Sequence, residues 1–151
     1  MSIELFILIL NVAATLYMVG LIWFVQIVHY PLMGQIGEEN YTEYQERHQR
    51  LTTWVVGPPM LTEAFTSVLM VAVPPVTSTA LTLLAVALLF LIWVSTGLLQ
   101  VPYHAQLAKG FDLKAHRGLV MTNWIRTIAW TLRGALVCWF LIEFVRLTAL
   151  R

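Results

Sequence analysis

Charged residues are what this sequence has least of. They make up 11% of its 151 residues, and hydrophobic residues make up 59%, whereas a soluble domain carries about 25% charged residues. A surface in contact with water cannot be built from so few charges, so the composition excludes an ordinary soluble domain. The net charge of +1 comes without a basic stripe, and nothing therefore predicts binding to nucleic acid.

Cysteine and the parts of a cleavable leader are also scarce. The one cysteine, Cys138, cannot form an internal disulfide, and in its apolar surroundings we expect it to act as a small hydrophobe. The first four residues lack the Lys or Arg of a signal peptide. The apolar run that follows, residues 5–28, can span a bilayer core, which requires about 20 helical residues. We expect it to be retained as a helix.

The chain contains four long apolar runs, and its mean hydropathy is +0.76. They predict helices over residues 4–32, 51–73, 79–107 and 117–147, with an amphipathic lead-in at 41–50 before the second. The connections are short, which makes consecutive helices antiparallel neighbours. The prediction is an all-α protein: a single transmembrane domain, 1–151, folded as an integral membrane four-helix up-down-up-down bundle.

Two local features of the second helix follow from residue type. Thr42 and Gln45 have the spacing of a capping box, which would start the lead-in. Gly57, Pro58 and Pro59 are expected to bend the membrane helix or to unwind it locally, since neighbouring groups in a bundle can satisfy the freed backbone.

Basic residues in the connections predict the orientation. They lie in the first connection, residues 34–50, and in the last, residues 109–117: Arg47, Arg50, Lys109, Lys114 and Arg117. Loops on the cytoplasmic side carry an excess of Lys and Arg. Both connections are therefore predicted to be cytoplasmic, and both termini to lie on the other side.

All four histidines fall at one end of the predicted bundle: His29, His48, His104 and His116. Neutral imidazole binds zinc, copper and iron and supplies axial ligands to haem. We therefore predict these four as ligands of haem or of a mononuclear metal, copper, iron or zinc. No CxxCH or HExxH motif chooses between these groups. The alternative is structural, because histidines at helix ends are common at the membrane interface.

Polar residues inside the predicted spans form stripes that lead to the same end. The third helix carries Thr96, Gln100 and His104, and the fourth carries His116, Asn123, Arg126 and Arg133. Such stripes must face the interior, because lipid offers no hydrogen-bond partners. Gln100, Arg126 and Arg133 are predicted to contact the cofactor. The planar fork of Arg126 suits a carboxylate such as a haem propionate.

Glu63 is the single charge in the second apolar run. A charge at the centre of a bilayer costs about 2.5–3.5 kcal/mol on insertion scales. We therefore expect an ion pair with Arg126 or Arg133, which would anchor the second helix to the fourth. The pair is either a structural clamp or part of a substrate or proton site. We predict Glu63, Asn123 and Arg126 as the catalytic residues.

Short stretches resemble known families. Residues 16–24, LYMVGLIWF, followed by His29-Tyr30-Pro31, resemble the first helix of the small bacterial membrane protoporphyrinogen oxidases and of the copper-resistance-D-type membrane proteins. Residues 123–126, NWIR, are similar to the fourth helix of the anthrone-oxygenase-like proteins. These resemblances imply a redox protein of the bacterial inner membrane that acts on a hydrophobic or tetrapyrrole-like substrate, with haem as a candidate cofactor. The chain departs from the protoporphyrinogen oxidase type in having no histidine before His29.

The prediction for function is a membrane-embedded metal- or haem-binding oxidoreductase acting on a hydrophobic, quinone-like or tetrapyrrole-like substrate. Two alternatives stay open. One is a non-enzymatic protein that binds or transports metal or haem, and the other is a structural subunit whose polar stripes only join helices. The expected partners are the lipid bilayer and a hydrophobic small molecule, metal or haem. A four-helix bundle has a slim core, so a homo-oligomer is compatible with the sequence.

Overall fold

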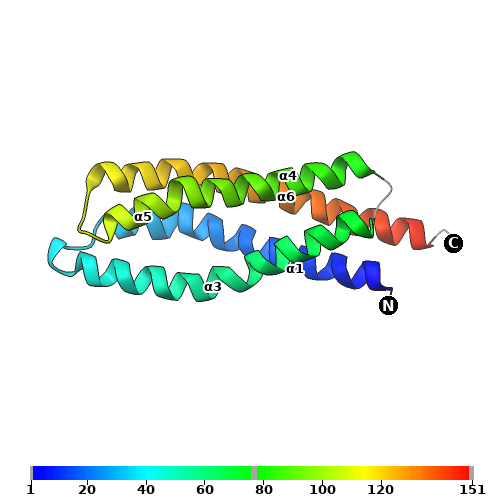
Figure 1. The fold of residues 1–151 in the computed structure, drawn as a ribbon, viewed down its shortest axis with the longest axis horizontal. Helices are drawn as coiled ribbons and strands as arrows, with labels where there is room; N and C mark the ends of the chain where they lie inside the picture. Colours follow the sequence, from blue (N-terminus) through cyan, green and yellow to red (C-terminus); the bar gives the residue numbers. More distant parts are fainter. Residues whose placement is uncertain (1, 76–77, 150–151) are drawn as a thin grey trace.

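The computed structural model describes residues 2–75 and 78–149, and every regular element in this part of the chain is helical. Four rods run alongside one another in alternating directions, with both ends of the chain at one end of the bundle (Figure 1). In chain order the elements are α1 (Ile3–Phe24), η1 (Val25–His29), α2 (Tyr30–Met33), α3 (Glu38–Ala72), α4 (Thr79–Ser95), η2 (Thr96–Gln100), α5 (Val101–Leu107) and α6 (Leu113–Ala149). The first three form one rod, α3 the second, the next three the third, and α6 the fourth. The predicted all-α four-helix bundle is confirmed.

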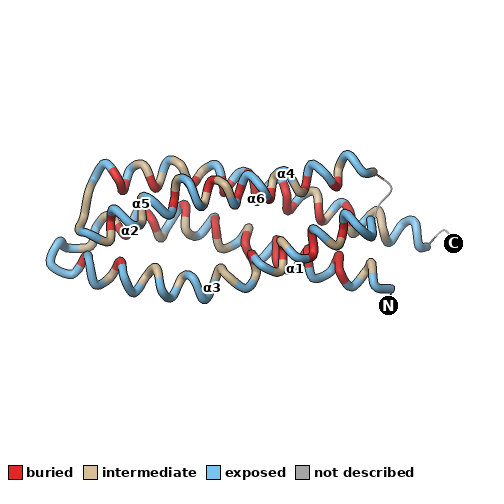
Figure 2. The backbone as a smooth tube through the Cα atoms, viewed as in Figure 1, coloured by how far each residue is buried: buried red, intermediate tan, exposed pale blue. Residues whose placement is uncertain are grey.

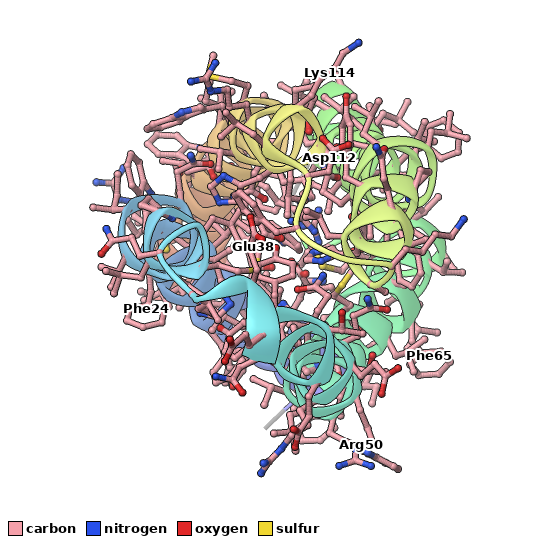
Figure 3. All side chains as sticks on the ribbon, turned by 90° about the vertical axis from the view of Figure 1, so that its left-hand side faces the viewer. Phe24, Glu38, Arg50, Phe65, Asp112 and Lys114 are labelled. Carbon is pink, nitrogen blue, oxygen red and sulfur yellow. The ribbon has the colours of Figure 1, made fainter. Side chains whose placement is uncertain are left out.

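Each rod is long and apolar enough to cross a membrane. The rods contain 31, 35, 29 and 37 residues, against the roughly 20 that a bilayer core requires. Large apolar side chains cover the outside: Trp54 is 76% exposed and Phe90 is 70% exposed. Phe24 and Phe65 point away from the bundle (Figure 3). Water disfavours so much exposed apolar surface, so this fold is suited to a lipid bilayer.

The second rod, α3, begins earlier than the predicted lead-in at 41–50 and continues without interruption into the membrane span. No side chain caps it, and Glu38 and Glu39 occupy its first turn, where negative charge is favourable beside a helix N-terminus. Thr42 and Gln45 lie inside the helix, so the predicted capping box is wrong. Gln45 is instead fully buried and bonds to the histidine cluster described below.

Pro58 and Pro59 lie inside α3, which stays helical through both of them. A proline removes one backbone donor and presses against the carbonyl four residues earlier, which bends a helix. α3 changes direction near its middle (Figure 1), and Thr62 Oγ1 donates to the carbonyl of Pro58 at 2.9 Å. Of the two predicted outcomes, the structure has the bend and not the local unwinding.

Two segments, η1 and η2, have the wider π-helical winding. In each, the N–H that follows the segment bonds to the carbonyl five residues back. One residue further on comes a proline, Pro31 or Pro102. Because proline clashes with the carbonyl four residues earlier, an extra residue in that turn relieves the contact. π-segments occur frequently at functional sites, and both of these lie toward the end of the bundle opposite to the chain termini (Figure 1).

The core consists of three clusters of buried apolar side chains along the bundle, and the buried positions line its interior (Figure 2). The cluster nearest the termini contains Leu8 and Phe140, the middle cluster contains Met18 and Trp130, and the third contains Tyr30. α1 packs closely on α3 and α6, and α4 packs closely on α6, whereas α3 touches α4 and α5 much less. The seam between α3 and the third rod is therefore the most open side of the bundle.

A buried ion pair joins Glu63 of α3 to Arg133 of α6. Arg133 Nε is 3.2 Å from Glu63 Oε1, and neither side chain is more than 1% exposed. Thr15 Oγ1 also donates to Oε1 at 2.7 Å, and Trp130 Nε1 donates to Oε2 at 3.0 Å. The expected pairing of Glu63 with the fourth helix is confirmed, with Arg133 as its partner.

The remaining donors of Arg133 bond to α3 once more and reach the other two rods. Nη1 donates to the carbonyl of Ala85 in α4 at 2.6 Å. Nη2 donates to Ser67 in α3 at 2.7 Å and to Asn11 in α1 at 3.1 Å. One ion pair thus connects all four rods. Both charged groups have several partners, as a charge pair removed from water requires.

The connection between α5 and α6 is short and capped. Gly110 has a φ of 138°, a conformation that glycine adopts without steric cost. The backbone N–H of Ala115 donates to Asp112 Oδ1 at 2.8 Å, and this bond lowers the pKa of Asp112 below its ordinary value. The cap fixes the start of α6 beside the end of α5, where the candidate site lies.

Replacing Arg133 with methionine should destabilise the bundle by about 3–5 kcal/mol, because Glu63 then stays buried without its partner charge. The double variant Glu63→Gln/Arg133→Met should recover part of that loss, since the amide no longer carries a charge and can still bond to Thr15 and Trp130. Unfolding in mixed detergent and SDS micelles measures both variants. A double variant no more stable than Arg133→Met would contradict the clamp role of the pair.

Candidate functional site

A histidine cluster occupies the end of the bundle away from the termini, which is the end that faces the viewer in Figure 3. It combines His29 at the end of η1, His48 in α3 and His104 in α5. Nε2 of His29 is 3.1 Å from Nδ1 of His48. The ring centroids of this pair are 4.6 Å apart, and those of His48 and His104 are 5.4 Å apart. Three rods thus bring three of the four predicted metal ligands together.

The fourth histidine, His116, has a different position. Its Nε2 is 2.7 Å from the backbone carbonyl of Tyr30, and a Cβ added at Gly34 would lie 2.7 Å from its Cε1. The ring therefore fills the space that a glycine leaves at the end of α2. His116 fastens this turn to α6, and in the described part of the chain it has no hydrogen bond or ring contact with the other histidines.

Tyr30 is a member of the cluster that the sequence reasoning missed. Its hydroxyl is 3.1 Å from Nε2 of His104 and accepts from Nη2 of Arg126 at 3.2 Å. The side chain is only 3% exposed. Gln26 and Tyr30 are four residues apart on a membrane helix, so a polar stripe extended by one step would have found this tyrosine.

The Gln45 amide, in the orientation that the structure gives it, is compatible with one hydrogen-bond direction through His104. Gln45 Nε2 is 2.8 Å from Nδ1 of His104, and an amide nitrogen only donates. With this amide orientation His104 accepts at Nδ1 and carries its proton at Nε2, from which it donates to the Tyr30 oxygen. Tyr30 then accepts from His104 and from Arg126. Its own hydroxyl proton remains available for a third partner.

Arg126 is held in place by neutral groups. Its Nε donates to Asn123 Oδ1 at 2.9 Å, and its Nη2 donates to the same oxygen and to Tyr30. Asn123 Nδ2 in turn donates to Gln26 Oε1 at 2.8 Å. The predicted catalytic residue Asn123 therefore orients Arg126. Predicted Gln100 is also buried, and it donates to Thr122 at 3.1 Å.

An apolar cavity of about 220 Å³ lies against this cluster. Its polar lining comprises Tyr30, His48, Gln49, Thr52, Thr53, Thr96, Gln100, His104 and Arg126. Most of the remaining wall is apolar and comes from α1 and α3, with Trp130 from α6. A concave apolar pocket with a few convergent polar groups is the usual form of a small-molecule site.

The pocket separates the predicted site residues into two sets. His48, His104, Gln100 and Arg126 line it. The other predicted residues, His29, Glu63, His116, Asn123 and Arg133, do not. Glu63 and Arg133 form the buried ion pair that joins the rods. His29 contacts His48 without lining the pocket. His116 and Asn123 position neighbouring groups.

A second cavity of about 470 Å³, here called the outer groove, lies along the polar face of α3. The cavity of about 220 Å³ is called the inner pocket. Asn40, Glu43 and Arg47 line it on the side of the exposed helix surface. His48 and Thr52 line both this outer groove and the inner pocket. These two side chains are therefore shared walls of the groove and the pocket.

The imidazoles do not converge on one point. Among residues 2–75 and 78–149, no group of three or more His, Cys, Asp or Glu side chains is placed to hold a metal ion. Both ring nitrogens of His104 have partners, and Nδ1 of His48 lies 3.1 Å from both His29 and Thr52. The haem or mononuclear metal predicted from the sequence stays a prediction. Within residues 2–75 and 78–149, the close nitrogen pair available to it is His29 Nε2 with His48 Nδ1.

Comparison with known proteins adds no family to this description. No protein-family model matches the chain, and neither the curated proteins nor the solved structures that were searched gave a match. The families named above therefore stay resemblances, and the functional argument rests on the geometry of the site.

Proposed function

We propose that this chain is a membrane-embedded oxidoreductase that binds a hydrophobic small molecule with an oxygen-bearing head, quinone-like in size, in the apolar pocket. One observation carries the proposal: Tyr30, His48, His104 and Arg126 meet on the wall of an apolar cavity inside four rods that are long and apolar enough to cross a membrane. A hydroxyl, imidazoles and a guanidinium all donate hydrogen bonds. Such donors suit a carbonyl or phenolic oxygen that enters from lipid.

The volume and the open side of the pocket support a ligand of this size. Drug-sized ligands occupy pockets of about 300–1,000 Å³, and this one has about 220 Å³, which favours a single ring with its head over a whole tetrapyrrole. Thr53 and Val101 line the pocket and are exposed on the outside of the bundle. They lie where α3 faces α5, along the open seam. A hydrocarbon tail can therefore remain in the bilayer.

The chain's own residues would supply binding and protons. Reduction of a quinone-like head couples electron uptake to proton uptake at its oxygens. Tyr30 can hold such an oxygen and exchange its hydroxyl proton with it, and its hydroxyl is 3.1 Å from Nε2 of His104, which can replace that proton. A haem, copper or iron bound by the histidines would supply the electron chemistry, which zinc, having no redox chemistry, would not.

The first test measures binding of a short-chain ubiquinone to the protein in mild detergent. Binding is monitored through quenching of tryptophan fluorescence. Trp130 lines the pocket, so saturable quenching is expected. Tyr30→Phe should weaken binding about tenfold, the equivalent of one hydrogen bond of about 1.4 kcal/mol. Tyr17→Phe is the matched control, because Tyr17 is 51% exposed on the outside of the same rod. Wild-type affinity in Tyr30→Phe would contradict the assigned site.

Metal binding is a second candidate, favoured by the 3.1 Å between His29 Nε2 and His48 Nδ1. Two nitrogens bound at about 2.0–2.1 Å to one tetrahedral zinc ion lie about 3.3 Å apart. A small adjustment of these rings would therefore accommodate an ion, with further positions left for water or substrate.

Metal analysis with an absorption spectrum tests this second candidate. We expect near-stoichiometric copper, iron or zinc, or haem, in the wild-type protein and its loss in His29→Ala and His48→Ala, because each removes one of the two close nitrogens. His116→Ala should keep the metal, since His116 bonds elsewhere. Colourless, metal-free protein that takes up none of these groups on addition would remove the metal candidate.

A further inference from the structure

Arg126 is a buried cation whose neighbours do not balance its charge. The side chain is 8% exposed, and its hydrogen-bond partners, Asn123 and Tyr30, are neutral. In the described ranges the ion pair of Arg133 with Glu63 is the only one found inside the bundle. Arg126 therefore has no carboxylate within ion-pair distance among residues 2–75 and 78–149.

This difference between the two arginines follows from how the structure uses Glu63. Both arginines lie on one polar stripe of α6, seven residues apart. Residue spacing alone therefore allows Glu63 to form an ion pair with either of them. The bonds from Thr15, Trp130 and Arg133 fix it at the deeper position. An arginine side chain carries a positive charge, and that of Arg126 remains without a counterpart in an apolar region.

The guanidinium also has donors to spare on the pocket side. Nε and Nη2 are occupied by Asn123 and Tyr30, and no hydrogen bond from Nη1 is found in the described part of the chain. Arg126 lines the inner pocket together with Tyr30, whose hydroxyl proton is available as described above. Two donors on neighbouring residues can therefore reach one ligand, and a low-dielectric setting strengthens their attraction for negative charge.

We infer that the pocket selects a hydrophobic molecule whose head is an anionic oxygen, a carboxylate. Arg126 supplies the counter-charge and Tyr30 the second hydrogen bond. The inference rests on the proposed function, since it names the chemical class of the ligand in the same pocket. An Arg–carboxylate contact is among the strongest hydrogen bonds available to a protein. The ligand is thus a lipid-soluble carboxylic acid that completes the charge balance of the site.

A matched pair of probes, decanoate and decanol, tests the inference by calorimetric titration in mild detergent above the pKa of the acid. The two probes share a chain and differ in head charge. Wild-type protein should bind decanoate about tenfold more tightly than decanol, equivalent to about 1.4 kcal/mol. Arg126→Gln should abolish this preference, because it should weaken decanoate binding much more than decanol binding. Arg47→Gln is the matched control, because Arg47 lines only the outer groove, and it should keep the preference.

The outcomes separate the inference from the proposed function. Equal binding of decanoate and decanol by wild-type protein, with the short-chain quinone also bound, would overturn the carboxylate inference and leave the pocket function standing. Failure of all three probes to bind would overturn both. Arg126→Lys keeps the charge without the planar fork, and it should keep a reduced preference for decanoate. This variant provides the same test if Arg126→Gln does not fold.

Discussion

The arrangement of this protein depends on how one carboxylate is kept in hydrocarbon. Lipid offers no hydrogen-bond partners, so Glu63 must find them within the bundle. It accepts bonds from α1 and α6, and its partner Arg133 extends the same network to α4. Because these bonds are directional, they fix the rotation of each rod about its axis as well as its position. Apolar packing alone constrains rotation much less, since lipid-facing and core-facing side chains are equally apolar.

The same clamp shapes the pocket next to it. Trp130 donates its indole proton to Glu63, and its side chain also lines the cavity. The network therefore sets the inner wall of the site, while the histidines and Tyr30 form its outer part. The network also pairs the carboxylate of Glu63 with Arg133, which leaves Arg126 with neutral partners. Structural clamp and candidate site are thus neighbouring parts of one polar stripe, and the separation of their roles comes from which arginine receives the carboxylate.

The fold could be predicted from the sequence because each apolar run fits a bilayer and the connections are short. The stripes on the third and fourth helices also gave the buried faces correctly for Gln100, Asn123 and Arg133. Residue spacing could not decide the partner of Glu63, since both arginines share one stripe. It also could not place His116 against the carbonyl of Tyr30, because that contact depends on how α2 ends. The ligand and the orientation of the loops stay predictions.

The π-segments explain why residues spaced by four can share one face. In an α-helix of 3.6 residues per turn, a spacing of four drifts by about 40° at each step. Met18, Ile22, Gln26 and Tyr30 are all buried despite three such steps, which would turn Tyr30 about 120° away from Met18. The wider turn at η1 removes part of this drift, and η2 does the same for Gln100 and His104. A period of four that leads into a proline is therefore a sequence signal for a π-segment. Here that signal marks the two places where the helices turn hydrogen-bonding side chains toward the pocket.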